Sequence, residues 1–411
     1  MAAKDVMLRC GAIMLEHLLD EEDGVSLDRS CPCGGKFTNK KRTGKNLQTV
    51  LGEVRVERTY QRCNKCGENR FAEDVVLDVE NTKFSPGLRR MMAKTGAQVC
   101  FDKARDMIWY LAGLRVTDKE VERVAEAAGA DIAGRVEEEM AAVMADEVPI
   151  PDGAPASLYI AADGTGVPVL RRETKGRKGK AADGIARTRE VKLGAIFTQT
   201  TFDDKGNPIR EPHSTTYVGK IESADSFGPR LYAEAFQRGF EKAERVVFIA
   251  DGAPWLWNIA DEYFPGATQI VDYYHAAEHI GDLARMLHPD DEVGRLRWRK
   301  RLTKALLKGK VEKVLIELGA LRVRGKKKEA VEKAIAYFEK NKERMRYGRF
   351  RQENLFIGSG VVEAGCKSLI GARLKQSGMH WTVRGANSII ALRCCVESGY
   401  FENYWESRRI A

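Results

Sequence analysis

Three short apolar runs, each leading into an aspartate, constrain the fold of this chain most. They are residues 158–162 before Asp163, 246–250 before Asp251 and 268–271 before Asp272. Helix-forming segments lie between and after these runs, and strands that alternate with helices predict an α/β layer architecture. In such sheets functional groups gather at the carboxyl ends of the strands. We therefore expect the three aspartates to converge.

Carboxylates brought together at one sheet edge are candidates for a metal site. Their oxygens suit Mg²⁺ or Mn²⁺, and two such ions can clamp a scissile phosphate. The chain between Asp163 and Asp251 is long enough to place the two acids on adjacent strands. On spacing alone, the third carboxylate could be Asp272, Glu278 or Glu363. The alternative is that each aspartate caps the helix that follows it.

Two close cysteine pairs predict a structural metal site nearer the N-terminus. Cys31 and Cys33 lie in "CPCGG", and Cys63 and Cys66 lie in "CNKCG". The segment between the pairs alternates apolar and polar residues, which is typical of a half-buried strand. Four thiolates can complete a tetrahedral Zn²⁺ site. The alternative is two pairs of free thiols.

Residues 83–147 have the pattern of helices separated by short breaks. Thr117 and Glu120 fit a capping box, which places a helix start just after the turn that contains Gly113. A helix, a short turn and a capped helix form the pattern of a helix-turn-helix, and an ordinary helical hairpin is the alternative. Residues 146–157, rich in proline, glycine and alanine, then predict a domain boundary.

Charge and composition narrow the class of partner. The 411-residue chain has a formal net charge of +9, which favours a polyanion such as nucleic acid. Its longest apolar runs fall short of the ~20 residues that a membrane helix needs. The first residues also lack the order of a signal peptide. We therefore expect a cytoplasmic protein.

The predicted domain order combines these segments. A basic helical block interrupts the α/β part, and the chain after it opens with a glycine-rich turn before Glu363. The predicted segments are an N-terminal helix (1–27), a zinc-ribbon-like module (28–75), a helical DNA-binding region (83–147), the first part of a catalytic core (158–282), a helical insertion (283–353) and the C-terminal part of the core (354–411).

Taken over nearly its whole length, the chain resembles the bacterial DDE transposases of the ISKra insertion-sequence type. The resemblance extends from the cysteine pairs to the C-terminus and rests on "AADGTGVP", "IADGAPWLWNIA", "IVDYYHAAEH" and "GSGVVEAGCKSLIGARLKQSGMHWTVRGANSIIALRCC". It implies an RNase H-like α/β catalytic core with an all-helical insertion. By that resemblance Asp163, Asp251 and Glu363 are the catalytic acids and hold Mg²⁺ or Mn²⁺. Asp272 and His275 would orient DNA or the neighbouring carboxylates, and a structural Asp–His pair is the alternative.

The same resemblance implies a reaction and its partners. Water would cleave a phosphodiester at an element end and free a 3′-hydroxyl, which would then attack target DNA in an in-line displacement. The partner would be double-stranded DNA, both transposon ends and target. Proteins of this kind act as homodimers or larger assemblies in the bacterial cytoplasm, associated with the nucleoid when bound to DNA.

Several side chains in the last section and beside the acids are candidates for DNA contacts. Stacking on a frayed base and core packing are both open for Trp255, Trp257 and Trp381. Arg384 would contact phosphate or pack within the last helix. The basic candidates are Lys367, Arg373, Lys375 and Arg384.

Two other functions stay open at this point. A structure-selective nuclease on the same fold would cleave DNA without joining it. A DNA-binding regulator descended from a transposase would carry a dead metal site. All three candidate acids are present in the sequence, which argues against the regulator.

Overall fold

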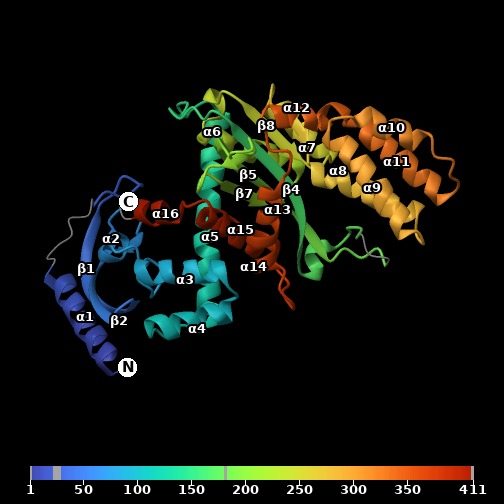
Figure 1. Cartoon of the computed structure of the whole chain (residues 1–411). Coiled ribbons are helices and arrows are strands. Elements are labelled where there is room, and N and C mark those ends of the chain that lie inside the picture. The colour runs from blue at the N-terminus through green and yellow to red at the C-terminus, as the bar shows by residue number, and fades with distance from the viewer. Residues whose placement is uncertain (1, 22–28, 180–182, 409–411) are drawn as a thin grey trace. The chain divides into compact units, whose positions relative to one another are not determined.

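The computed structural model of the 411-residue chain describes residues 2–21, 29–179 and 183–408. They form a mixed α/β protein with a helical part (Figure 1). The chain divides into two compact units, residues 1–132 with 400–411 and residues 133–399. Helix α5 (Asp118–Met144) continues from the first unit into the second. No helix in the described ranges is long and apolar enough to cross a membrane.

The first unit is built around a three-stranded antiparallel sheet. Strand β1 (Phe37–Thr49) pairs with β2 (Gly52–Cys63), which pairs with the short β3 (Asn69–Phe71). Because side chains alternate between the faces of a strand, Val54 and Val56 of β2 are both buried. Helix α2 (Ala72–Val76) follows β3 directly.

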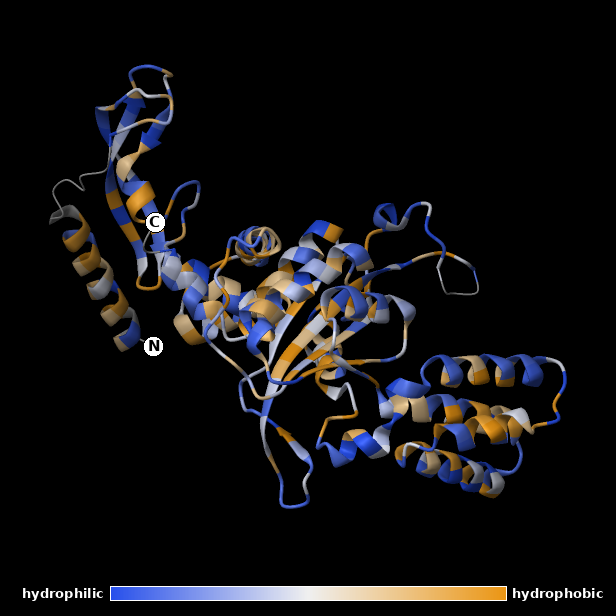
Figure 2. Ribbon diagram, turned by 90° about the horizontal axis from the view of Figure 1, so that it is seen from above, coloured by the Kyte–Doolittle hydropathy of each residue, from blue (hydrophilic) through white to orange (hydrophobic). Residues whose placement is uncertain are grey.

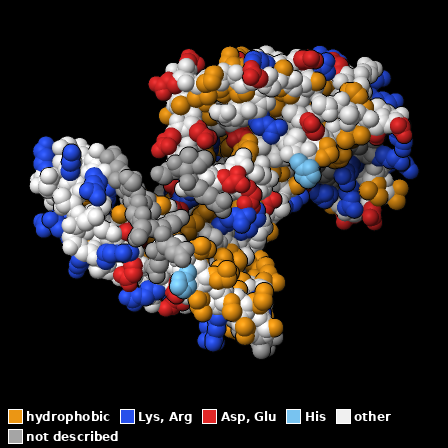
Figure 3. Space-filling view, turned by 90° about the vertical axis from the view of Figure 1, so that its left-hand side faces the viewer, with side chains coloured by type: hydrophobic (Ala, Val, Ile, Leu, Met, Phe, Trp, Pro, Cys, Tyr) orange, Lys and Arg blue, Asp and Glu red, His pale blue; other side chains and the backbone are white. Residues whose placement is uncertain are grey.

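Helix α1 (Ala2–Glu21) packs on this sheet with one side, through Ala12. Apolar side chains gather on its other side (Figure 3). They are exposed by 58 to 75% and comprise Val6, Met7, Ile13, Met14 and Leu18. Residue 1 and residues 22–27 of the predicted N-terminal segment lie outside the described residues, so the boundary of that segment stays a prediction.

Two helices lead from the sheet to α5: α3 (Pro86–Gln98) and α4 (Phe101–Ala112). Helix α4 ends at Gly113, whose φ of +77° is a left-handed conformation that glycine adopts without strain. The N–H of Thr117 donates to Oε2 of Glu120 at 2.8 Å, and the N–H of Glu120 donates to Oγ1 of Thr117 at 3.2 Å. The predicted capping box is confirmed. The C-terminal helix α16 (Phe401–Ser407) also belongs to this unit.

The second unit holds a six-stranded mixed sheet of order β6-β5-β4-β8-β9, in which β7 also pairs with β5. Strand β5 is antiparallel to β4, β6 and β7, whereas β8 is parallel to both β4 and β9. The strands are β4 (Leu158–Pro168), β5 (Thr188–Phe202), β6 (Pro208–Arg210), β7 (Thr216–Lys220), β8 (Val246–Ala250) and β9 (Thr268–Val271).

Two of the three strands end where the apolar runs predict. Strand β8 stops one residue before Asp251, and β9 stops one residue before Asp272. Strand β4 instead continues past Asp163, because residues 164–168 keep their antiparallel pairing with β5. The prediction that Asp163 ends its strand is therefore wrong. Asp163 lies inside β4, beyond the point where the parallel pairing with β8 stops.

Helices cover both faces of the sheet. On β5, Gly194 faces Leu231 of α6 (Ala224–Gln237), whereas the adjacent Leu193 faces Gly365 of α13 (Gly360–Gly365). Because neighbouring residues of a strand point to opposite faces, α6 and α13 lie on opposite sides of the sheet. The other helices around the sheet are α7 (Pro254–Tyr263), α8 (Tyr273–Leu287), α14 (Ala372–Leu374) and α15 (Val383–Glu397), and a π-helical segment, η4 (Cys366–Gly371), joins α13 to α14.

A helical insertion lies between α8 and α13. Its helices are α9 (Glu292–Leu307), α10 (Val311–Gly319), α11 (Lys326–Lys340) and α12 (Tyr347–Gln352). Figure 2 shows hydrophobic residues both along these helices and in the strands of the sheet. Leu306, Val314 and Phe338 of the insertion are fully buried in the same apolar cluster as Phe248 of β8. The insertion is therefore packed onto the sheet through a shared core.

Candidate functional site

A cavity of about 600 Å³ lies in the second unit, within the size range of ligand sites. Side chains from β4, the end of β8, α8, α13 and η4 meet there. The three acids implied by the sequence, Asp163, Asp251 and Glu363, all line it. The complete lining is Ala162, Asp163, Thr165, Asp251, His275, Glu278, Ser359, Glu363, Cys366, Lys367, Gly371 and Lys375.

Asp163 and Asp251 lie at equivalent positions beyond the paired segment of the adjacent parallel strands β4 and β8. The pairing of β4 with β8 runs from Leu158 opposite Val246 to Ala161 opposite Ile249. Each aspartate is two residues beyond the last of these pairs, so the two are in register. Neighbouring strands lie about 4.8 Å apart. The sheet therefore brings the two carboxylates to the same edge of the cavity.

The carboxylates of Asp251 and Glu363 are close enough to Asp163 to repel its negative charge. Burial raises the pKa of Asp163, and the negative charges of Asp251 and Glu363 raise it further. The N–H of Gly164, 2.6 Å from Oδ1 of Asp163, and the thiol of Cys366 donate to this carboxylate and act in the opposite direction. A cation in the cavity would relieve this like-charge repulsion.

Asp251 is held from both its side chain and its backbone. Its Oδ1 accepts the N–H of Ala253 at 2.8 Å, but Ala253 is itself the N-cap residue of α7 and this cap has no side-chain hydrogen bond, so Asp251 does not cap the helix that follows it. Its backbone carbonyl accepts a hydrogen bond from the hydroxyl of Tyr337 in α11 at 3.1 Å. The adjacent Gly252 has a φ of +104°, and a Cβ there would lie 2.8 Å from the Tyr337 ring. The insertion thus contacts the chain at the residue that follows β8.

Asp272 is fully buried and does not line the cavity. Its Oδ1 accepts the N–H of His275 at 2.8 Å and caps α8. Its Oδ2 accepts both the N–H and the hydroxyl of Ser359, the latter at 2.7 Å. The Ser359 hydroxyl is also 3.3 Å from Oε1 of Glu363. Asp272 therefore reaches the acid site through Ser359, in the glycine-rich turn before Glu363.

Helix α8 contributes His275 and Glu278 to the cavity. His279, one turn further, is turned toward the insertion, where its ring lies 4.2 Å from that of Tyr337. Burial lowers the pKa of His279, and the neighbouring His275 lowers it further. Since Asp272 bonds the backbone of His275, the imidazole of His275 is left to face the cavity.

The basic candidates of the last section have different surroundings. Lys367 is largely exposed and pairs with Glu363 at 3.8 Å. The ammonium group of Lys375 donates to the hydroxyl of Thr165 at the cavity wall. Arg384, on the first turn of α15, is exposed. Arg373 is fully buried, with its guanidinium 5.2 Å from the centre of the Trp381 ring, so this side chain offers no surface to DNA in this conformation.

The three tryptophans near these motifs pack within the second unit. Trp257 and Trp381 are 3% and 8% exposed. Trp255 is partly buried, and the ammonium group of Lys192 lies 4.1 Å from its ring centre. These surroundings favour core packing over base stacking.

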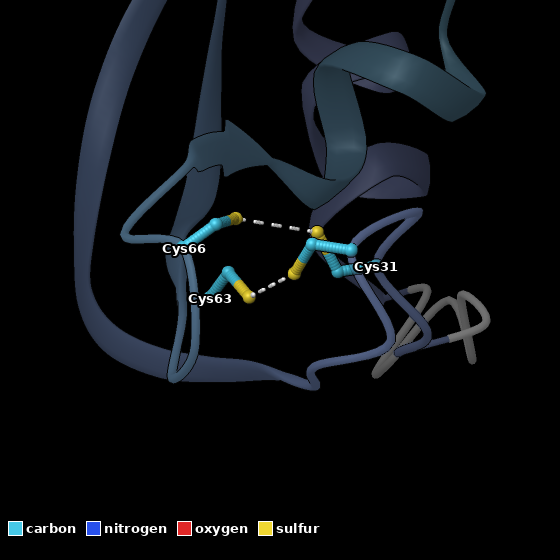
Figure 4. Close-up of side chains that lie close together, drawn as sticks. Cys31, Cys63 and Cys66 are labelled. Carbon is cyan, nitrogen blue, oxygen red and sulfur yellow. Dashed lines mark hydrogen bonds between the residues drawn. The ribbon is translucent and has the colours of Figure 1, made fainter.

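In the first unit, four cysteine sulfurs lie within 4.8 Å of one another. Figure 4 shows Cys31 and Cys66, whose sulfurs are 3.6 Å apart, and Cys63, whose sulfur is 3.5 Å from that of Cys33. Sulfurs around a tetrahedral Zn²⁺ are roughly 3.8 Å apart for Zn–S bonds near 2.3 Å. The predicted pairs thus form a cluster that could bind zinc.

The pKa values of the cysteines in this cluster also favour the binding of a cation. Backbone N–H groups of Cys66 and Lys65 donate to the Cys63 sulfur and lower its pKa to about 6. The pKa of Cys31 rises to about 12: a backbone hydrogen bond from Cys33 lowers it, but burial and the neighbouring sulfurs raise it more. One thiolate therefore forms readily, and the next is disfavoured unless a cation is bound.

The acid site is less tightly drawn together than the cysteine cluster. A group of three or more Cys, His, Asp or Glu side chains could hold a metal ion where its ligand atoms all lie within 4.8 Å of one another. Within the described ranges, the four cysteines form such a group. Asp163, Asp251 and Glu363 share one cavity without reaching that spacing. Their donor type fits Mg²⁺ or Mn²⁺, since hard carboxylate oxygens are what these ions prefer.

Ser359, Tyr337 and Cys366 are among the residues at the site that were not predicted as site residues. Ser359 is four residues before Glu363, a spacing that places it one helical turn away. The sequence alone could therefore have identified Ser359 as a neighbour of Glu363. Nothing local marks Tyr337, because its contact with Asp251 joins residues far apart in the chain.

Comparison with known sequences gives a family match over part of the chain. The profile of an uncharacterised protein family, UPF0236, matches residues 232–408, which include Asp251, Asp272 and Glu363. Two UPF0236 proteins of Caldanaerobacter subterraneus subsp. tengcongensis are similar to the chain, each at 21% identity over 96% of this chain and 76% of the relative. The name of the first joins eleven loci of that genome, and the name of the second joins four.

One solved structure has a weak similarity. It is the Drosophila P element transposase strand transfer complex, with 10% identity, a TM-score of 0.27 and coverage of 80% of this chain and 82% of that one. A TM-score this low does not establish a shared fold.

Proposed function

We propose that this protein is a DDE transposase with an RNase H-like catalytic core. The observation that carries the proposal is the placement of Asp163 and Asp251 at equivalent positions, two residues beyond the last paired residues of the parallel strands β4 and β8, with Glu363 on the wall of the same cavity. The mixed sheet and the insertion packed onto it support the RNase H-like assignment that the resemblance implies.

The three acids would hold Mg²⁺ or Mn²⁺ in the cavity. Such ions, when bound, lower the pKa of water and neutralise charge that develops on a phosphate. The protein would fix the carboxylates for this task. The sheet register sets the spacing of Asp163 and Asp251, while Ser359, held by the buried Asp272, orients Glu363.

The reaction needs no covalent bond to the protein. Water would attack the phosphorus atom at an element end, the P–O3′ bond would break, and the 3′-oxygen would leave and take up a proton. That 3′-hydroxyl would then attack a target phosphodiester and lose its proton, with the displaced oxygen leaving in line. Lys367 and Lys375, on the cavity wall, would contact phosphate oxygens next to the reacting group.

Other parts of the chain would bind DNA or support the fold. The cysteine cluster would hold one structural Zn²⁺, and the helices α3 to α5 would recognise transposon ends. We further propose that the protein acts as a dimer or larger assembly on DNA, as the resemblance implies. The eleven loci in one relative's name agree with a mobile element, because an element that inserts copies of itself accumulates in a genome.

The experiment that tests this function is a cleavage and strand-transfer assay with Mn²⁺ or Mg²⁺. The substrate is duplex DNA taken from either side of the gene, with a circular plasmid as target. We expect nicks at defined end positions and joined products. Cleavage without joining would support the nuclease instead, and binding without cleavage would support the regulator.

A further inference from the structure

The helical insertion holds more than the whole net positive charge of the chain. Residues 283–353 contain 22 Lys and Arg against 10 Asp and Glu, a net charge of +12, whereas the entire chain carries +9. The remaining residues are therefore slightly acidic in sum. A charge concentrated in one block of a protein creates a local field that attracts polyanions.

Within the insertion, one face of α9 is basic along its length. Arg297, Lys300 and Lys304 of α9, together with its C-cap residue Lys308, follow one another at spacings of three and four residues, which places them on one helical face. All four side chains are exposed, on the side opposite the buried Leu302 and Leu306. We call these four residues the α9 row. At 1.5 Å per residue the row is about 16 Å long.

The α9 row lacks the compensating acids that mark an ordinary solvated helix. No ion pair of these four side chains occurs among the described residues, although their neighbour Arg301 pairs with Glu317 at 2.6 Å. The one acid within α9 is Glu292, in its first turn. Helix α11 provides the contrast, because its lysines alternate with Glu329, Glu332 and Glu339, and Lys328 lies 3.6 Å from Glu332.

The position of α9 links the row to the cavity. Helix α9 packs against α8, whose residues His275 and Glu278 line the cavity. The hydroxyl of Tyr273, the first residue of α8, donates to the backbone carbonyl of Thr303 at 3.5 Å. The C-terminal end of α9, next to Lys304, is therefore beside the cavity end of α8. From that point the row extends along α9 toward its N-terminal end, as far as Arg297.

We propose that the α9 row binds the phosphate backbone of duplex DNA on the flank of the segment held in the cavity. This inference rests on the proposed function, since it assumes that the cavity takes a scissile phosphate. One strand of duplex DNA advances 3.4 Å per nucleotide along the axis, so about 16 Å corresponds to roughly five base pairs. The contacts carry no sequence information, because they reach phosphates only.

The test compares two variants with the same change in charge. The first replaces the row by Arg297→Gln, Lys300→Gln, Lys304→Gln and Lys308→Gln. The matched control replaces four exposed lysines of α11 by Lys326→Gln, Lys328→Gln, Lys333→Gln and Lys340→Gln. Binding of a 40-base-pair duplex to the full-length protein is measured at several salt concentrations without divalent ions, and far-ultraviolet circular dichroism checks the fold of each variant.

We expect the row variant to bind at least 10-fold more weakly at ~0.15 M salt and to lose up to ~3.6 from the salt slope, at about 0.9 per phosphate contact. The control should stay within about 3-fold of the wild type. Equal losses in the two variants, or no loss in the row variant, would overturn the proposal. So would a larger loss on duplex RNA than on DNA. Failure of the proposed function would appear separately, as a wild-type protein that binds DNA but never cleaves it.

Discussion

Ser359 is fixed to the buried Asp272 by two hydrogen bonds, from its backbone N–H and from its hydroxyl, the latter at 2.7 Å. This relationship joins the start of α8 to the turn that leads into α13. Glu363 follows one helical turn later, with its Oε1 3.3 Å from the same hydroxyl. The position of Glu363 thus depends, through Ser359, on Asp272, which does not itself line the cavity.

Ser359→Ala should lower kcat about 10-fold while KM for DNA changes little, because groups that orient metal-binding carboxylates contribute about 10- to 100-fold to activity. Steady-state cleavage at several DNA concentrations separates the two constants. Ser359→Thr keeps the hydroxyl and should recover most of kcat. An equal loss in the Thr and Ala variants would show that the hydroxyl does not position Glu363.

Asp272→Asn should reduce the free energy of unfolding by about 2 kcal/mol, since a buried carboxylate that accepts three hydrogen bonds is replaced by an amide whose NH₂ group, in either orientation, faces at least one backbone N–H donor. Urea titration measures the change. Asp291→Asn is the matched control, because Asp291 also caps a helix, α9, but at the surface. The loss of unfolding free energy should be clearly larger for Asp272→Asn than for Asp291→Asn. Equal losses would contradict a stabilising role for the buried hydrogen bonds of Asp272.

Asp163→Asn should raise the melting temperature of the metal-free protein by a few degrees. Burial and two neighbouring carboxylates raise the pKa of Asp163, so its ionised form opposes folding. The unfavourable contribution grows as the pH rises through the interval between the ordinary pKa and the raised pKa, and it is absent below that interval. The variant should therefore be more stable than the wild type at pH 7 and equal to it in acid. A variant less stable at pH 7 would contradict this electrostatic account.

The cysteine cluster should hold one Zn²⁺ per chain, and Cys63→Ser should abolish this binding and unfold the sheet of the first unit. Because Zn²⁺ displaces protons from the thiols, its affinity should fall as the pH is lowered. Metal analysis of the dialysed protein and a colorimetric zinc release assay between pH 5 and 8 measure both effects. Cys10→Ser, which alters an exposed free thiol, is the control and should retain full zinc content.

Gly252→Ala should destabilise the protein by at least ~1 kcal/mol and reduce cleavage, because its φ of +104° and the Tyr337 ring at 2.8 Å leave no room for a Cβ. Thermal unfolding and the cleavage rate report both changes. Gly134→Ala, in α5, meets no atom within 4 Å and should be neutral or slightly stabilising. Wild-type behaviour of the Gly252 variant would show that the insertion does not pack closely on the Asp251 turn.

Features set by short stretches of chain could be predicted from the sequence. The apolar runs before Asp251 and Asp272 become β8 and β9, the alternating segment becomes β2, and Thr117 caps α5. Each depends on residues within one element or one turn. The two cysteine pairs also come together as predicted, because the pairing of the consecutive strands β1 and β2 places Phe37 opposite Cys63.

Features that depend on distant segments could not be predicted. Strand β4 runs past Asp163 because β5 pairs with it, and the apolar run alone gives no sign of that extension. Arg373 is basic and adjacent to exposed positions, yet the packing of Trp381 buries it. The contact between Tyr337 and Asp251 requires the insertion to fold back onto the sheet. The periodicity of residues within one helix or strand does not predict such long-range packing.

The central claim is that Asp163, Asp251 and Glu363 act together as the metal-dependent catalytic site. The most direct test is the Mn²⁺-dependent rate of end cleavage for Asp163→Asn, Asp251→Asn and Glu363→Gln beside the wild type, with Asp290→Asn as an exposed acid outside the cavity. We predict that the three variants bind the DNA with wild-type affinity and cleave at background level, while Asp290→Asn cleaves at the wild-type rate. Cleavage at the wild-type rate by any one of the three variants would contradict the claim.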